Sequence, residues 1–170
     1  MVMVTESVSL LIVVVYLLQI VADCGEGIFN SFIRTLVHGD SAHLIFNLLS
    51  FSNVSQMLNS VVMRSHYILV LMLIWMLDVI VDAILTHYKL KWCAVGFSGV
   101  IFGLITYLYL YAKIDPVEMF KSIALLLLPG LIYPNISNVG HIVGIFNGAL
   151  VYILLNWTNV TSATLTPLAG

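Results

Sequence analysis

The chain has 170 residues, of which 61% are hydrophobic and only 8% are charged, and its mean hydropathy is +1.09. Soluble domains carry about 25% charged residues, so a water-soluble fold of this length could not bury so much apolar surface, and the composition indicates an integral membrane protein. The net charge is −2 without a basic patch, which gives nucleic acid nothing to bind.

Six apolar segments predict one all-α polytopic membrane domain over residues 1–170, with a core of about 7–157 and a polar tail at 158–170. Backbone polar groups must be satisfied inside lipid, so we expect every segment to be a helix. Most segments approach the roughly 20 residues that a spanning helix needs. The first lacks a basic n-region and a cleavage site, so we expect it to be retained as a span. The segments cover residues 7–22, 42–63, 66–85, 93–112, 118–133 and 138–157.

The cysteines and the basic residues give little guidance on compartment or orientation. Cys24 and Cys93 are too few for a disulfide framework and have no metal-ligand spacing. We therefore expect free thiols, and neither a metal nor a cofactor. The Lys and Arg residues divide three against three between the two sides of the membrane, so the positive-inside rule gives no orientation. Those on the side of the N-terminus are Arg64, Lys113 and Lys121, and those opposite are Arg34, Lys89 and Lys91.

Polar side chains recur where the second, fourth and sixth segments begin. With six spans, all three of these segments begin on the side opposite the N-terminus. His43 and Asn47 are four residues apart near the start of the second segment, so they point the same way from a helix. Ser98 lies about one and a half turns into the fourth segment, and His141 lies near the start of the sixth. The succession of spans therefore predicts that these four residues share one layer of the membrane.

Glycines indicate which helices touch. Gly99 and Gly103 are four residues apart in the fourth segment, and Gly140, Gly144 and Gly148 repeat that spacing in the sixth. Faces of small residues let membrane helices approach closely. If these two faces meet, the serine and the late histidine of the polar layer lie at the same end of the contact.

A serine beside a histidine suits nucleophilic catalysis. A serine hydroxyl becomes a good nucleophile when a base within about 3 Å takes its proton, and histidine, with an ordinary pKa near 6.5, is such a base. The oxyanion that then develops needs hydrogen-bond donors, each worth roughly 3–4 kcal/mol in acyl-transfer enzymes. The available donors are the Ser98 N–H, the His43 ring and the Asn47 amide.

Three motifs in order resemble the rhomboid family of intramembrane serine proteases: H-x-x-x-N, GFSG and GH-x-x-G-x-x-x-G. The resemblance covers residues 38–148 and implies a bundle of six transmembrane helices. It implies that Ser98 and His141 form a catalytic dyad. It also implies that His43 and Asn47 help to build the oxyanion hole. The implied activity is cleavage of the transmembrane segments of membrane-protein substrates within the lipid bilayer, through an acyl-enzyme.

The stretches HGDSAHLIFN, CAVGFSGVIFG and PNISNVGHIVGIFNG look closest to the endoplasmic-reticulum/Golgi branch related to rhomboid-related protein 4. That likeness implies a multi-pass protein of the endoplasmic reticulum or Golgi membrane, with a cytosolic N-terminus. Two features depart from the family pattern. The aromatic residue that often stacks on the catalytic histidine is Phe102 rather than tyrosine, and the Trp-Arg signature survives at best as Ile33-Arg34. We expect Gly96 to keep the start of the fourth helix slim, and His38 to hold the loop before the second helix.

The polar residues also have simpler interpretations. Considered without the other motifs, Ser98 would be interpreted as a packing residue. The alternative function is that of a catalytically silent rhomboid-fold protein, which binds membrane clients for quality control. Relatives of that type typically lose the serine or the histidine, and this chain has both. Asp78 and Asp82 raise a third hypothesis, a small proton-coupled transporter, which the lack of internal repeats disfavours. We expect Asp82 to reach the membrane interface, and the deeper Asp78 either to hydrogen-bond to a neighbouring helix or to be protonated.

Overall fold

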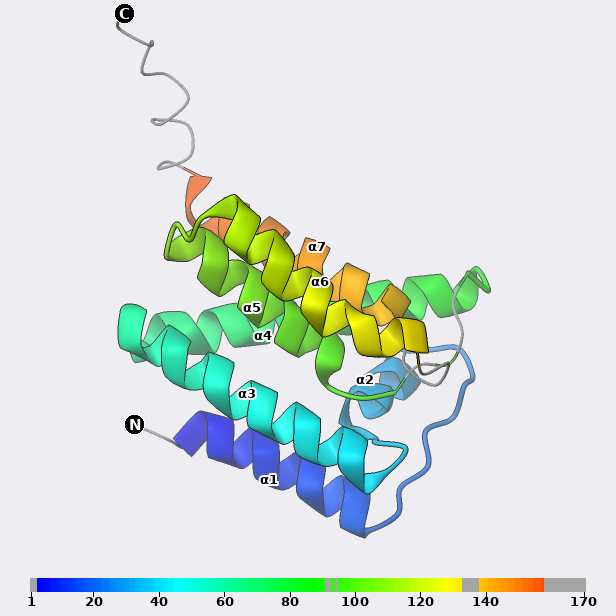
Figure 1. Cartoon of the computed structure of the whole chain (residues 1–170). Helices are drawn as coiled ribbons and strands as arrows, with labels where there is room; N and C mark the ends of the chain where they lie inside the picture. Colours follow the sequence, from blue (N-terminus) through cyan, green and yellow to red (C-terminus); the bar gives the residue numbers. More distant parts are fainter. Residues whose placement is uncertain (1–2, 91–92, 94, 133–137, 158–170) are drawn as a thin grey trace, which may run out of the picture.

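The structure is a computed structural model that describes residues 3–90, 93, 95–132 and 138–157 (Figure 1). Over this part of the chain all regular structure is helical, in seven helices and no strand, so the predicted all-α class is confirmed. The helices are α1 (Met3–Leu17), α2 (Ile28–Leu36), α3 (Ser41–Val61), α4 (Arg64–His87), α5 (Ser98–Tyr111), α6 (Pro116–Ile132) and α7 (Asn138–Leu155).

The six longer helices alternate in direction, so that α3, α5 and α7 all begin at one end of the bundle (Figure 1). The short helix α2 lies at this same end, which we call the α2 end, and the N-terminus lies at the other. Helix α5 contacts α3, α4, α6 and α7. Nearly all its positions from 99 to 108 are buried, which is typical of a helix enclosed by other helices.

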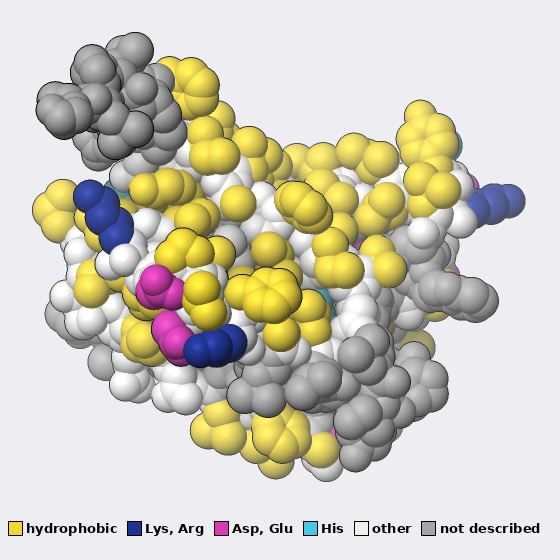
Figure 2. All heavy atoms as spheres, turned by 45° about the horizontal axis from the view of Figure 1, so that its top comes forward, with side chains coloured by type: hydrophobic (Ala, Val, Ile, Leu, Met, Phe, Trp, Pro, Cys, Tyr) yellow, Lys and Arg dark blue, Asp and Glu magenta, His cyan; other side chains and the backbone are white. Residues whose placement is uncertain are grey.

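The outside of the bundle is apolar. Among the described residues, α4 and α7 are long and apolar enough to cross a membrane, whereas α1 and α5 are apolar but shorter. Large hydrophobic side chains are exposed along most of the helices, and Figure 2 shows one face that they dominate. Soluble monomers rarely expose continuous apolar surface on this scale, so the surface fits a lipid environment.

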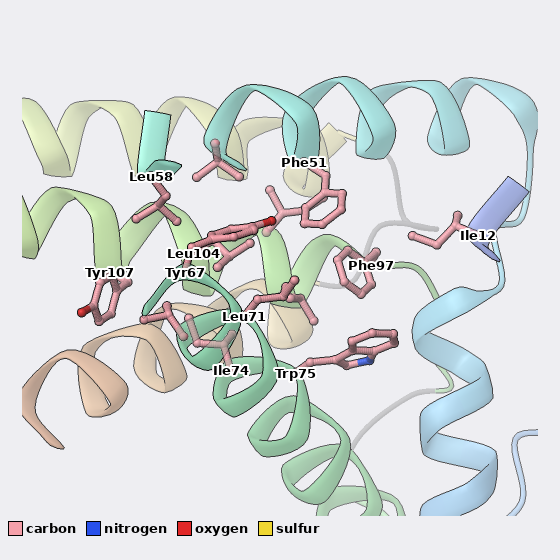
Figure 3. Close-up of a cluster of buried hydrophobic side chains, with 14 of the residues drawn as sticks. Ile12, Phe51, Leu58, Tyr67, Leu71, Ile74, Trp75, Phe97, Leu104 and Tyr107 are labelled. Atoms are coloured by element: carbon pink, nitrogen blue, oxygen red, sulfur yellow. The ribbon is translucent and has the colours of Figure 1, made fainter. Parts of the chain in front are cut away.

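The core is most tightly built where the chain enters α5. Phe97 is fully buried, and its ring meets the edges or faces of Phe51 from α3 and Trp75 from α4, both with ring centroids 5.1 Å away (Figure 3). Aromatic pairs in this arrangement add roughly 0.5–1.5 kcal/mol each beyond their burial. The chain is therefore fixed in the core at the residue before Ser98.

Helices α5 and α7 approach each other through glycine. A Cβ atom on Gly144 would clash with the backbone of Gly99, and a Cβ on Gly148 would clash with the backbone of Gly103. On its other side, Gly103 lies against the side chain of Ile74 from α4. The contact thus brings two backbones together without intervening side chains, and it fixes the start of α7 beside the start of α5.

The expectation of free thiols is wrong. Cys24 and Cys93 form a disulfide with a Cα–Cα distance of 5.2 Å. The two residues are 69 positions apart in the chain, and only the folded arrangement brings the α1–α2 loop against the segment that leads into α5. The spacing of two cysteines carries no information on such a pairing.

The fourth predicted segment also begins too early. Residues 95–97 are not helical, and α5 begins at Ser98, which is therefore its first residue rather than one and a half turns inside. The physical reason is Gly96, whose φ of +114° lies in a region that glycine adopts readily and other residues rarely do. Helix α2 is a further difference, because it lies between the first two predicted segments, 7–22 and 42–63, where no helix is predicted.

Candidate active site

Ser98 lies at the N-terminus of α5, at the α2 end of the bundle. The first backbone N–H groups of a helix have no acceptor inside it, and the first intrahelical bond here is donated by Ile101 to the Phe97 carbonyl. The N–H groups of Ser98, Gly99 and Val100 therefore point out of the helix end. A position with a hydroxyl and free N–H donors suits the attack on a carbonyl and the stabilisation of its oxyanion.

The structure brings His141 to Ser98. The Nε2 atom of His141, in the first turn of α7, lies 3.0 Å from the Ser98 Oγ. His141 is only 6% exposed, and its ring stacks on Phe102 with a centroid distance of 4.4 Å and an interplanar angle of 19°. In the tautomer with the proton on Nδ1, Nε2 accepts from the serine hydroxyl, which is the arrangement of a general base and its nucleophile. Among the described residues, Nδ1 has no hydrogen-bond partner.

His43 lies on the other side of the segment that leads to Ser98. A Cβ atom on Gly96 would lie 2.7 Å from the His43 Cε1, so the absence of a side chain at Gly96 leaves room for the ring. Asp40 caps α3 by accepting from the His43 backbone N–H at 2.8 Å, which fixes the first turn of the helix. The imidazole thus lies beside Gly96, which is two residues before the serine in sequence.

Asn47 lies one turn further along α3 and is 6% exposed. Its Nδ2 donates to the His43 carbonyl at 2.9 Å, and its Oδ1 has no partner among the described residues. Within that part of the chain it makes no hydrogen bond to Ser98 or His141. The structure therefore brings Ser98, His141 and His43 to one place and leaves Asn47 a turn away, with one amide hydrogen still free to donate.

His38 occupies the loop between α2 and α3. It is 6% exposed, its Nδ1 lies 3.1 Å from the Leu36 carbonyl, and its ring centroid is 4.9 Å from that of His43. Burial is the largest cause that lowers the pKa of His38, and the neighbouring His43 lowers it as well; the Leu36 carbonyl and Asp40 raise it less, and the resulting pKa is about 4. His38 is therefore neutral in the folded protein at ordinary pH. Its contacts join the loop to the first turn of α3.

The two acidic residues of α4 have different surroundings. The Asp78 carboxylate lies against the first turn of α5, since a Cβ on Gly99 would be 2.7 Å from its Oδ1. Asp82 is buried and accepts hydrogen bonds from the Nε and Nη2 atoms of Arg34. The Arg34 guanidinium compensates its charge inside the bundle. That Asp82 lies at the depth of the membrane interface stays a prediction, because burial within the protein does not give a depth in the membrane.

Sequence reasoning missed the role of α2. Its polar residues Ser31, Arg34 and Thr35 are buried, while the apolar side chains of Ile28 and Phe29 are exposed. The available signal was the spacing of the three polar residues, which share one face of a helix.

As for metals, no three His, Cys, Asp or Glu side chains converge on a possible ion among the residues described.

Comparison with known proteins gives the family. The Rhomboid domain model matches residues 25–158 of this chain. The chain is also 33% identical over 156 residues to the "Putative rhomboid protein L523" of Acanthamoeba polyphaga mimivirus, an alignment that covers 89% of this chain and 90% of that protein. The family match includes α2 to α7, and with them the serine, both histidines and the glycine contact described above. The resemblance seen in the motifs is confirmed at this level, and the chain belongs to the rhomboid family.

Proposed function

We propose that this protein is an intramembrane serine endopeptidase that cleaves transmembrane segments of membrane-protein substrates with Ser98 as nucleophile and His141 as base. The observation that carries the proposal is the 3.0 Å separation of His141 Nε2 and Ser98 Oγ at the N-terminus of α5. A packing serine has no need of a buried imidazole in hydrogen-bond contact, whereas a nucleophile does. Membership of the rhomboid family supports the same activity.

In the proposed reaction, the Ser98 Oγ attacks the scissile carbonyl carbon while His141 Nε2 takes the hydroxyl proton. The backbone N–H groups at the start of α5 and the His43 ring donate to the oxyanion, with Asn47 as a further donor if its free amide hydrogen turns toward the site. The imidazolium then gives its proton to the leaving amine, and an acyl-enzyme remains. Water, deprotonated by His141, hydrolyses the ester and restores the serine. Peptide backbone must leave its helix to reach Ser98, so segments that unwind readily are the expected substrates.

We further propose that α1, α3, α4, α5, α6 and α7 all cross the membrane. Helix α5 has 14 residues and is thus about 21 Å long, whereas the hydrocarbon core of a bilayer is about 30 Å thick. If the C-terminal end of α5 lies at the interface on the N-terminal side, Ser98 lies roughly 9 Å below the opposite interface. The burial of α5 by its neighbours supports such a depth, since other helices shield its ends from lipid.

The disulfide supports an orientation in which the α2 end faces the lumen and the N-terminus faces the cytosol. Disulfides persist in the secretory compartments and are rare in the cytosol, and the Cys24–Cys93 disulfide joins the α1–α2 loop to the segment that leads into α5, which begins at the α2 end (Figure 1). Location in the endoplasmic reticulum or Golgi membrane, as in the branch related to rhomboid-related protein 4, fits this orientation.

The test is labelling of the detergent-solubilised protein with a fluorophosphonate probe, which reacts with activated serine hydroxyls. The variants Ser98→Ala and His141→Ala are compared with wild type, and a thermal melt shows that each is folded. We expect wild type to be labelled and both variants to remain unlabelled, because one lacks the nucleophile and the other the base.

The opposite outcome favours the second function. If folded wild type is labelled no more than Ser98→Ala, and a model transmembrane substrate in liposomes stays uncut, then the serine is not activated. Binding of membrane clients without cleavage would then explain the fold better than proteolysis.

A further inference from the structure

Arg34 is the most extensively bonded side chain in the described part of the chain, although it lies outside the dyad. It is 2% exposed, and its guanidinium donates to groups on α2, on α4 and on the α1–α2 loop. These acceptors, with the Arg34 side chain, form what we call the Arg34 network. They are Asp82 Oδ2, Ser31 Oγ at 2.8 Å, Thr86 Oγ1 at 3.1 Å, and the carbonyl oxygens of Asp23 at 2.9 Å and Gly25 at 3.0 Å.

Stability alone does not explain such a network. Moving an ion pair out of water is costly, and well-packed apolar residues in its place are often neutral or stabilising. A guanidinium offers five N–H donors in a rigid plane, so it fixes the relative positions of all its acceptors at once. Arg34 thereby fixes α2 and residues 23–25 relative to the C-terminal part of α4.

The backbone of Arg34 connects this network to the site. Its carbonyl accepts a hydrogen bond of 2.9 Å from the N–H of Gly96, two residues before Ser98. Gly96 has the positive φ that ends the loop and starts α5, and it lies against the His43 ring. The Cys24–Cys93 disulfide joins the same two segments a few residues away.

We propose that Arg34 is a positioning residue for the reaction: through Gly96 it fixes the path of the chain into Ser98 relative to His43 and the dyad. The inference rests on the proposed protease function. Arg34 itself does not touch the reacting atoms. Arg34 instead determines how the Ser98 hydroxyl and the N–H donors of α5 are placed relative to the substrate carbonyl group. A displacement of about 1 Å in such an arrangement lowers the rate by up to about 100-fold.

Two variants separate positioning from folding. Arg34→Lys keeps the positive charge beside Asp82, but a single ammonium cannot replace the planar fork that also engages residues 23 and 25. The double variant Arg34→Met with Asp82→Leu removes both charges of this pair together, so neither of the two is left buried without the other. In both, we expect the rate constant of fluorophosphonate labelling per folded molecule to fall by about 10- to 100-fold. With a model transmembrane substrate, kcat should fall and KM should stay unchanged, because Arg34 does not face the substrate.

The matched control is His87→Gln. His87 pairs with Glu26 at 2.8 Å and so joins the same loop to the same helix, but both side chains are exposed. We expect this variant to react like wild type. If wild type is labelled and the Arg34 variants react at the same rate per folded molecule, with only the labelled fraction reduced, then Arg34 is merely structural and the inference is overturned. If wild type itself is not labelled, the proposed function fails instead.

Discussion

At the scale of single residues, the local surroundings of Ser98 supply what a nucleophile needs. The helix begins at the serine, so its N–H donors are free, and His141 lies within hydrogen-bond distance. Phe102, four residues later, stacks on the imidazole. The face of the Phe102 ring makes the stacking contact with His141, so phenylalanine can replace tyrosine at this position without loss of the contact. Phe102 and the glycine contact leave His141 little freedom to turn away from the serine.

His38 predicts an effect of pH on stability. Its pKa is about 4 in the folded protein, below the ordinary value of 6.5 that applies when the chain is unfolded. Between these values the unfolded state binds the proton more readily, so folding stability is full above pH 6.5 and falls as the pH drops toward 4. The largest loss from this residue is on the order of 3 kcal/mol. We expect the melting temperature in detergent to fall between pH 7 and pH 4.5.

The matched variant for that measurement is His38→Gln, which keeps a side-chain N–H for the Leu36 carbonyl but does not titrate. Its melting temperature should depend less on pH over the same interval. An equal pH dependence in the variant and in wild type would show that other groups cause the loss.

At the scale of elements, the contacts between helices that depend on the spacing of residues along a helix were predicted correctly from the sequence. The glycine spacing predicted that the fourth and sixth segments meet, and in the structure Gly144 packs on Gly99 and Gly148 on Gly103. The order of the segments predicted the shared layer, and Ser98 and His141 are in contact. Such spacing is visible because it repeats with the helical period.

The features that could not be predicted from the sequence are those that depend on tertiary contacts. Helix α2 buries Ser31, Arg34 and Thr35 and exposes Ile28 and Phe29, so the soluble-protein pattern, in which the apolar face is the buried one, does not describe it. The pairing of Arg34 with Asp82 joins residues 48 positions apart, and nothing local specifies it. The start of α5 was misplaced because the apolar run continues through the loop, and only the backbone conformation of Gly96 marks the end of that loop.

The close contact of α5 and α7 predicts a strong effect of one methyl group. In Gly144→Ala the new Cβ would meet the Gly99 backbone, which cannot move aside as a side chain could. Overpacking of this kind destabilises by roughly 1–3 kcal/mol, and more where backbone must shift. We expect a lower melting temperature and, because α7 carries His141, slower fluorophosphonate labelling per folded molecule.

Phe146→Ala is the control for that variant. Phe146 is on the same helix but 70% exposed on the outside of the bundle, so its loss should change neither quantity by much. If Gly144→Ala melts and reacts as wild type does, then the two helices are further apart than in this structure.

At the scale of the whole molecule, the covalent and ionic links between different elements gather at one end, among the residues that the structure describes. The disulfide, the Arg34 network and the His87–Glu26 pair all join the α1–α2 loop to parts of the chain that follow α3. These links fix the α1–α2 loop against the end of the bundle at which α5 begins. In the chain-entropy model, a cross-link between residues 69 positions apart contributes about 4 kcal/mol to stability. At the opposite end of the bundle, hydrogen bonds such as that between His66 and Tyr107 join different helices, and the ion pair of Lys121 with Glu118 lies within α6.

The disulfide also predicts the orientation of the whole molecule in a cell. The chain has two cysteines, Cys24 and Cys93, and their disulfide joins the α1–α2 loop to the segment that leads into α5, which begins at the α2 end. If that end faces the lumen of the secretory pathway, the pair is oxidised, because cytosolic thiols are kept reduced. Protein denatured directly from isolated membranes should then react with a maleimide–polyethylene glycol only after reduction, and Cys24→Ser should react without it. Reduction should also lower the melting temperature of wild type and leave that of Cys24→Ser unchanged. Two freely reactive thiols in unreduced wild type would instead place the α2 end, and Ser98 with it, on the cytosolic side.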